Sequence, residues 1–283
     1  MLSNLKKIRQ ELSPLYPSNE IEGIIRIIFD HLKNWSPVDI VLHRDDILSD
    51  YITEKIDSIL SRLKQHEPIQ YIIGEGRFFG RTFKVTPDTL IPRQETEELV
   101  EMIIKDFANI DDLQVFDVGT GSGCIAISLA FNLPFSIVTG IDISLKAIEI
   151  ASENAKSMKA HRVSFHTADI FTLLPQQDSL DIIVSNPPYI PTEDCLHLQQ
   201  EVMQEPAMAL DGGQDGYDFY RRIAHEAPAY LNPDGSVWLE VGFDQAPTVM
   251  ALLKDAGFAY VASHEDYQHI ARMVEGCLSP EET

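Results

Sequence analysis

The fold is decided by residues 115–125, Val-Phe-Asp-Val-Gly-Thr-Gly-Ser-Gly-Cys-Ile. The apolar residues before Gly119 are typical of a buried strand, and the residues after Gly123 continue in a helical pattern. Glycine adopts positive φ and lets the backbone approach a ligand closely, and a helix N-terminus supplies free N–H groups. The stretch therefore predicts a strand, a ligand-binding turn and a helix.

The glycine spacing excludes one common class of ligand. A dinucleotide fingerprint requires GxGxxG, whereas here Gly119, Gly121 and Gly123 alternate and Cys124 follows. Asp117, just before the first glycine, also disfavours a phosphate nearby. The turn is thus predicted to bind a ligand other than NAD.

Strand and helix patterns alternate from residue 113 onward. This alternation predicts an α/β domain in which helices cover both faces of a mostly parallel sheet. The last strand follows its predecessor too closely for a crossover helix, so it must run antiparallel. The seven candidate strands are Gln114–Val118, Ile137–Asp142, Val163–Thr167, Leu180–Ser185, Val237–Val241, Phe258–Ala262 and Ile270–Glu275.

The chain before this sheet has a different character. Residues 1–72 are predicted to form a helical domain, with an apolar stripe at helical spacing through Ile21–Leu32. Residues 73–91, in which glycines interrupt β-forming residues, predict a β-hairpin linker. Residues 92–283 form the third part, which opens with a helix beginning at Gln94 or Thr96.

Acidic residues stand where two of the predicted parallel strands end. Asp142 closes the second strand and can accept both hydroxyls of a ribose. After the third strand, Asp169 can accept N–H bonds from an amino group, and Ile170 or Phe171 can cover a purine. Ligands of open α/β sheets bind at this edge, so the set predicts a pocket for adenosine with a cationic, phosphate-free tail. S-adenosylmethionine fits that description.

The fourth strand ends in Asn186-Pro187-Pro188-Tyr189. Proline has no N–H and keeps the preceding residue extended, so this loop is stiff. The Asn186 side-chain oxygen and the Pro187 carbonyl can accept two N–H bonds from one NH2 group, and Tyr189 can cover its face. The loop is therefore predicted to bind a planar group that carries an NH2.

Composition limits the partners. The formal net charge is −22, and residues 1–72 contribute little of it, with 9 basic and 11 acidic side chains. A surface this acidic repels phosphate backbones, so we expect no direct contact with nucleic acid. Three distant cysteines and scattered histidines predict neither a disulfide nor a metal site. With no signal peptide and no apolar run long enough to span a bilayer, we expect a cytoplasmic monomer.

Taken together, these motifs resemble the PrmC/HemK family of protein-(glutamine-N5) methyltransferases, which are class I S-adenosylmethionine-dependent enzymes that act on peptide-chain release factors. The resemblance covers nearly the whole chain. It implies a Rossmann-like methyltransferase sheet after a helical domain that recognises the substrate. The segments that carry it are 68–74, 89–97, 117–123, 186–189 and 205–210.

The resemblance also implies roles for individual residues. The cofactor would contact the glycine turn, both acids, the residues beside the second acid and the loop asparagine: Gly119, Thr120, Gly121, Ser122, Gly123, Asp142, Asp169, Ile170, Phe171 and Asn186. The substrate glutamine would lie against Asn186, Pro187, Pro188 and Tyr189, with Asn186 and Pro187 directing the chemistry. Ile170 stands where family members can carry Trp, and Gln94 where Pro is common. The roles of Arg93 and Glu95 stay open.

Two other hypotheses are compatible with parts of the pattern. A DNA or ribosomal RNA methyltransferase acting on an exocyclic amino group would share Asn186–Tyr189, but the acidic sheet domain and the lack of a Lys/Arg cluster disfavour it. A cofactor-binding adaptor without catalysis would not need Asn186. Both are weaker than methylation of a release-factor glutamine.

Overall fold

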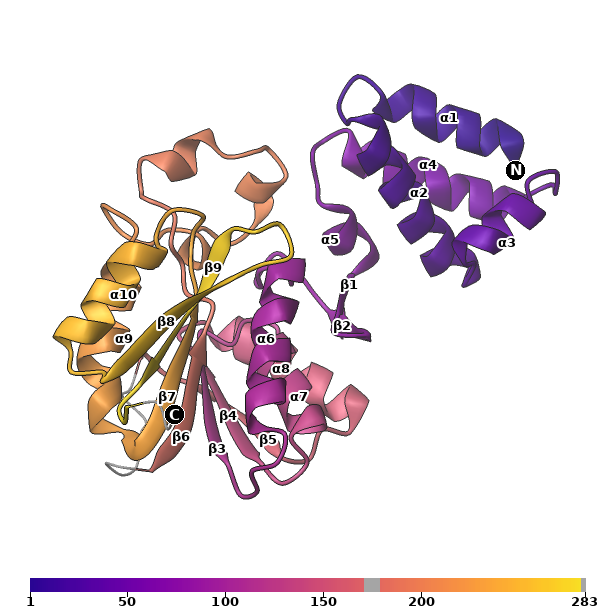
Figure 1. Cartoon of the computed structure of the whole chain (residues 1–283). Helices are drawn as coiled ribbons and strands as arrows, with labels where there is room; N and C mark the ends of the chain where they lie inside the picture. Colours follow the sequence, from indigo (N-terminus) through magenta and orange to yellow (C-terminus); the bar gives the residue numbers. More distant parts are fainter. Residues whose placement is uncertain (171–178, 281–283) are drawn as a thin grey trace. The chain divides into compact units, whose positions relative to one another are not determined.

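The computed structural model describes residues 1–170 and 179–280. The chain divides into two compact units (Figure 1). The helical unit comprises residues 1–74 together with 199–204, and the sheet unit comprises residues 75–198 and 205–283.

The helical unit is built around one apolar core. Its helices are α1 (Leu2–Leu12), α2 (Ser18–Lys33), α3 (Pro37–Leu42), α4 (Asp50–Leu63) and α5 (Ile69–Ile73). Ile21, Ile24, Ile25 and Ile28 are buried on one face of α2, as the apolar spacing predicts. Ser36 caps α3, where it forms a reciprocal capping box with Asp39.

The short segment 199–204 belongs to this unit, although it is distant in sequence. Glu201 Oε1 lies 2.8 Å from His66 Nδ1, at the turn that follows α4. Nearby, the Tyr16 hydroxyl donates to the Leu63 carbonyl at 2.9 Å. Polar contacts thus accompany the apolar packing at this end of the unit.

The sheet unit contains the predicted seven-stranded sheet, in the order β5-β4-β3-β6-β7-β9-β8. β9 is the one strand of this sheet that runs antiparallel to the others, and it pairs with both β7 and β8. The fold prediction is therefore confirmed. The strands are β3 (Gln114–Val118), β4 (Ile137–Asp142), β5 (Val163–Thr167), β6 (Leu180–Ser185), β7 (Leu231–Glu240), β8 (Tyr260–Glu265) and β9 (Ala271–Cys277).

The predicted bounds of the last three strands were wrong by one to six residues. β7 begins at Leu231 rather than Val237, because the turn-like residues 232–235 form an irregularity within the strand opposite Leu180 and Ile182. β8 begins after Phe258, whose N–H donates to the Leu253 carbonyl at 3.2 Å and so completes the end of a helix instead.

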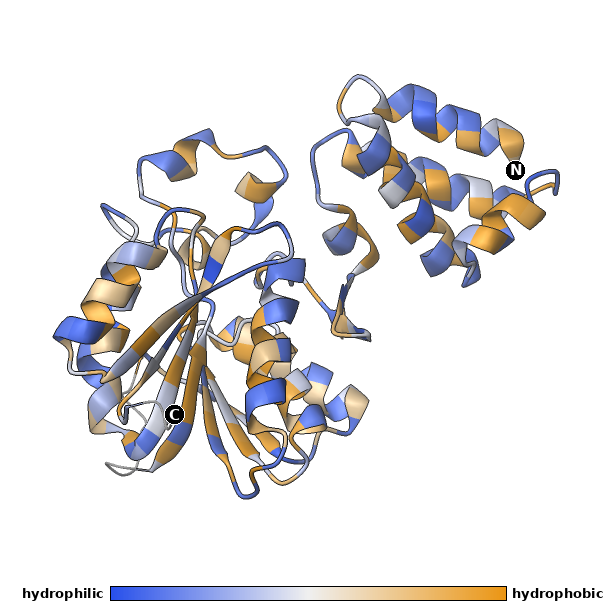
Figure 2. Ribbon diagram, viewed as in Figure 1, coloured by the Kyte–Doolittle hydropathy of each residue, from blue (hydrophilic) through white to orange (hydrophobic). Residues whose placement is uncertain are grey.

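Helices cover both faces of the sheet (Figure 1). One face carries α6 (Gln94–Phe107), α7 (Cys124–Asn132) and α8 (Leu145–Met158), and the other carries α9 (Asp218–Glu226) and α10 (Ala246–Asp255). The strands are mostly hydrophobic, and hydrophilic residues lie on the outer faces of the helices (Figure 2). The hairpin β1–β2 (Glu75–Phe78 and Arg81–Lys84) belongs to the same unit.

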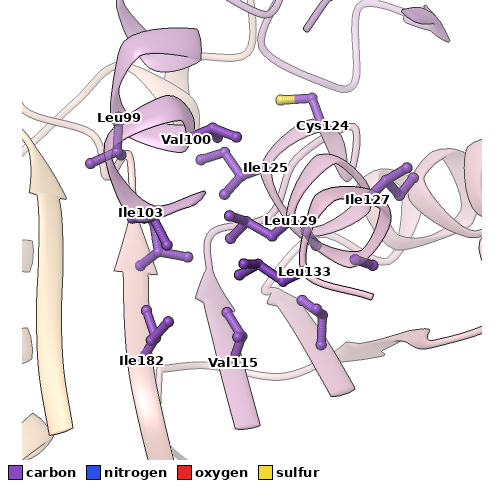
Figure 3. Packing of buried hydrophobic residues seen from close by; sticks show 14 of the residues in the cluster. Leu99, Val100, Ile103, Val115, Cys124, Ile125, Ile127, Leu129, Leu133 and Ile182 are labelled. Atoms are coloured by element: carbon purple, nitrogen blue, oxygen red, sulfur yellow. The ribbon is translucent and has the colours of Figure 1, made fainter. Parts of the chain in front are cut away.

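Each face has its own apolar core. In the first, Leu99 and Ile103 of α6 and Leu129 of α7 point toward Val115 of β3 and Ile182 of β6 (Figure 3). All five are buried. This packing fixes the start of α6 above the end of β6.

We predict that Gly140→Ala destabilises the sheet unit by about 1–3 kcal/mol, the usual cost of overpacking. Gly140 lies within β4, and a Cβ there would stand 2.6 Å from the Phe165 ring and 2.7 Å from Thr120 Oγ1. Urea unfolding, followed by Trp238 fluorescence in a Trp35→Phe background, measures the free energy of unfolding of this unit.

The matched control is Gly23→Ala in the helical unit, where an added Cβ meets no atom within 4 Å. This control should leave the urea midpoint reported by Trp238 unchanged. A Gly140→Ala transition that coincides with the parent's would show that the strand tolerates the methyl group.

Candidate active site

A cavity of about 640 Å³ opens where the parallel strands end. This volume is in the range of pockets that bind small molecules and cofactors. Residues that follow β3, β4, β5 and β6 line it, together with residues from 206–213 and from α9. The predicted position of the site, at the carboxyl edge of the sheet, is where the structure has its cavity.

The glycine turn after β3 forms one wall. Gly119 and Gly121 line the cavity and have φ of 73° and 55°. A Cβ at Gly119 would meet no atom within 4 Å, so the backbone there faces open space. Gly123 differs, because its Cβ would lie 2.9 Å from Phe165. Gly123, Thr120 and Ser122 are not among the lining residues.

Asp117 holds this turn from inside. It is fully buried, and its Oδ2 accepts the Thr120 hydroxyl at 2.6 Å and the Ala126 N–H at 3.2 Å. Within the described chain, its Oδ1 has no hydrogen-bond partner. Burial raises the pKa of Asp117 to about 7. The residue therefore shapes the turn without lining the cavity.

Asp142 lies at the cavity, at the end of β4. Its Oδ2 accepts the Gly121 N–H at 3.0 Å, and its Oδ1 accepts the Ser144 N–H at 2.9 Å. Burial raises the pKa of this carboxyl. Since each carboxylate oxygen can accept more than one bond, both retain capacity for ligand hydroxyls.

Asp169 and Ile170 also line the cavity, and Arg222 of α9 binds both. Arg222 Nη1 donates to Asp169 Oδ1 at 2.7 Å, and Nη2 donates to the Ile170 carbonyl at 3.0 Å. The hydrogen bond from Arg222 lowers the pKa of Asp169. Sequence reasoning missed Arg222, because nothing in the α9 pattern indicates that it reaches this loop. Phe171 lies outside the described residues.

The loop after β6 forms another wall. Asn186, Pro187 and Pro188 line the cavity. Tyr189 does not line it, and its ring packs against the core beneath α9 and α10. Its carbonyl accepts a hydrogen bond from Gln245 Nε2 at 2.9 Å. Burial raises the pKa of Tyr189 to about 12.

Two buried residues from other elements support Asn186. Its Nδ2 donates to Thr96 Oγ1 at 3.1 Å, and Thr96 Oγ1 donates to Glu240 Oε2 at 2.6 Å. Thr96 lies in the first turn of α6, and Glu240 ends β7. Sequence analysis assigned neither residue to the site.

Arg93, whose role the sequence leaves open, forms an ion pair at the start of α6. Arg93, the N-cap of α6, forms an ion pair with Glu205. The other Glu205 oxygen accepts the Ile91 N–H at 3.0 Å. Glu205 is buried, and the residues that follow it, 206–209, line the cavity. Arg93 thus ties that lining segment to the start of α6.

The comparisons with known proteins agree with this geometry. Residues 4–74 match the family described as PrmC N-terminal domain, and residues 109–277 match a methyltransferase domain family. A release factor glutamine methyltransferase of Geobacter sulfurreducens is 45% identical over 77% of this chain and 76% of its own length. One from Coxiella burnetii is 35% identical over 95% of both chains.

The chain belongs to the release factor glutamine methyltransferases. The resemblance drawn from the motifs is thereby confirmed. A solved methyltransferase from Pyrococcus furiosus shares the fold, with a TM-score of 0.54, 16% identity and coverage of 82% of this chain and all of that one.

The described residues offer neither a candidate metal site nor a candidate membrane span. No group of three or more His, Cys, Asp or Glu side chains in the described part of this family member could hold a metal ion. No helix within residues 1–170 and 179–280 is long and apolar enough to cross a membrane.

We predict that Asp117→Asn flattens the pH dependence of the free energy of unfolding. The carboxyl has a pKa of about 7 when folded, against an ordinary value of 3.8. The native state therefore holds a proton that the unfolded state releases, so stability falls as pH rises from about 4 to 7. Urea unfolding at several pH values measures the slope.

Exposed Asp111 provides the control. Asp111→Asn should retain the parent's slope. If Asp117→Asn also retains it, the buried carboxyl does not hold a proton in this range.

Proposed function

We propose that this chain transfers a methyl group from S-adenosyl-L-methionine to the side-chain amide N5 of the glutamine in the Gly-Gly-Gln motif of peptide-chain release factors. The observation that carries the proposal is the orientation of Asn186. Its Nδ2 donates to Thr96, and the two atoms of a carboxamide point apart. Its Oδ1 is thus left to accept an N–H bond at a cavity that the residue lines.

The residues around the cavity fit the cofactor. Open space at Gly119 and Gly121 can receive its methionine part, and the Asp142 carboxylate can accept its ribose hydroxyls. Ile170 offers an apolar surface to adenine. Thr120, Ser122 and Gly123 would contribute by shaping the turn. When bound, the cofactor supplies an electrophilic methyl group on a sulfonium centre.

The protein's task is then mainly placement. An amide nitrogen is a poor nucleophile because its lone pair is delocalised, so the nitrogen must be aligned with the methyl carbon and the sulfur. The Asn186 oxygen and the Pro187 carbonyl would accept both N–H bonds of the glutamine and stabilise the positive charge that develops there. The nitrogen would bond to the methyl carbon as the carbon–sulfur bond breaks and leaves its electron pair on sulfur, which becomes a neutral thioether. The nitrogen then loses one proton to solvent, so no strong base is needed beforehand.

The remaining assignments follow from this activity. We assign recognition of the release factor to the helical residues 1–72, because their near-neutral net charge suits a protein surface better than the strongly acidic remainder does. Pro188 and Tyr189 would shape the glutamine site, Tyr189 by packing beneath it. A substrate that acts in translation places the enzyme in the cytoplasm, and a monomer contains every residue used here.

The decisive assay supplies labelled S-adenosylmethionine with a purified release factor or with ribosomal RNA. We predict that the label enters the release factor and is lost when the glutamine of its Gly-Gly-Gln motif is changed to alanine. Mass spectrometry of the peptide locates the methyl group. Label in RNA alone would reject the proposal in favour of methylation of an exocyclic amine.

We predict that Asn186→Ala lowers kcat on the order of 10²-fold or more, because orientation and charge stabilisation are both lost. Affinity for S-adenosylhomocysteine, measured by calorimetry, should change little. Asn132→Ala, a matched change at the end of α7, should leave kcat unaltered. Near-normal turnover in Asn186→Ala would remove the role given to the carboxamide.

A further inference from the structure

Thr96 lies between the carboxyl group of Glu240 and the carboxamide of Asn186, which lines the cavity. It is 3% exposed, and Glu240 is likewise 3% exposed. The Thr96 hydroxyl donates to Glu240 Oε2 at 2.6 Å. Thr96 Oγ1 also accepts a hydrogen bond from Asn186 Nδ2 at 3.1 Å. Neither Thr96 nor Glu240 lines the cavity.

The chemistry of these groups fixes the direction of both bonds. An ionised carboxylate can only accept, and a hydroxyl has a single proton to donate. When Glu240 is ionised, the Thr96 proton is therefore directed toward it, and the Thr96 lone pairs are left for a donor. Only the NH2 end of Asn186 can supply that bond, so the amide oxygen is directed away from Thr96.

We propose that Thr96 and Glu240 are positioning residues that fix the Asn186 carboxamide with its oxygen toward the substrate NH2. This inference rests on the proposed function and adds to it the groups that set the orientation of Asn186. A buried hydrogen-bond chain suits this task, because each member limits the arrangements open to the next.

Protonation of Glu240 would reverse the direction of both hydrogen bonds. A protonated carboxyl can donate to Thr96 Oγ1, which frees the Thr96 proton for Asn186. The Asn186 side-chain oxygen would then accept a hydrogen bond from Thr96, and its NH2 would turn toward the cavity. Two NH2 groups would face each other there, so the substrate would lose an acceptor and gain a competing donor.

Glu240 has charged and titratable neighbours on several elements. Its pKa is raised to about 7, and burial is the largest cause. The hydrogen bond from Thr96 opposes this shift, Glu95 adds to it, and Arg272 and Arg93 oppose it. The groups that face it are Arg93 and Glu95 at the start of α6, Cys124 of α7, Tyr189 after β6, Tyr220 of α9 and Arg272 of β9. The productive form is the ionised one, so turnover should fall as pH drops below about 7.

The first test compares two substitutions of Thr96 in the full-length enzyme. Thr96→Val keeps the shape but removes the hydroxyl, and it should lower kcat by at least about tenfold, the lower limit for a lost hydrogen bond to a charged group. Thr96→Ser should recover most of that loss. Ser128→Ala, which removes a buried hydroxyl on α7 away from the site, should leave kcat unaltered.

The second test is the pH profile of Glu240→Gln. With a pKa of about 7, kcat of the parent should be roughly tenfold lower at pH 6 than at pH 8. Glutamine cannot ionise, so the variant should show nearly equal kcat at the two pH values. A purely structural role for Glu240 would lower kcat without changing the profile.

A third measurement does not depend on turnover. Calorimetry with a Gly-Gly-Gln peptide, in the presence of S-adenosylhomocysteine, should show binding that weakens from pH 8 to pH 6 in the parent but not in Glu240→Gln. If Thr96→Val does not fold, this comparison and the Glu240→Gln profile decide the inference.

The possible failures can be told apart. If the parent enzyme methylates no release factor, the proposed function itself is wrong. If the parent is active, the inference is overturned when Glu240→Gln retains the tenfold fall toward pH 6. It is equally overturned when a folded Thr96→Val that binds S-adenosylhomocysteine normally turns over at the parent's rate.

Discussion

The site depends on the parallel register of three strands. β3 lies between β4 and β6, and Val118 is level with Ile141 on one side and Ser185 on the other. The residues that follow, Gly119, Asp142 and Asn186, therefore emerge at the same edge of the sheet. The Ser185 hydroxyl donates to the Val118 carbonyl at 2.7 Å and joins β6 to β3 just before the strands end. A slip in either pairing would separate the cofactor turn from the carboxamide.

Charged residues, most of them buried, then fix the loops that leave this edge. Asp117 holds the glycine turn, Arg222 holds the loop after β5, and Glu205 holds the segment at 206–209. Glu240, through Thr96, reaches the loop after β6. Burying an acid is unfavourable unless its oxygens are hydrogen-bonded. Where such acids persist beside a site, they restrict the loops to few conformations, which suits a reaction that depends on placement.

Sequence reasoning found the residues that act locally and missed those that act at a distance. The strands β3, β4, β5 and β6 begin and end where predicted, because each is a short run rich in β-branched and aromatic residues, a pattern that is local to the chain. Thr96 could not be assigned, since its partners are 90 and 144 residues away and its position resembles any first helical turn. Arg222 reaches back 53 residues to Asp169. Tyr189 was expected over the substrate; its ring is partly buried against the core, and the expected contact stays a prediction.

The sequence by itself determined the alternation of strands and helices, the glycine turn, the acid that closes β4 and the diproline loop. These features rest on backbone preferences and on local spacing, which operate within a few residues. The tertiary structure alone decided which way the Asn186 amide points, which residues hold the turns and that the Tyr189 ring packs against the core. Such properties arise from contacts between elements far apart in the chain, and no local pattern encodes them.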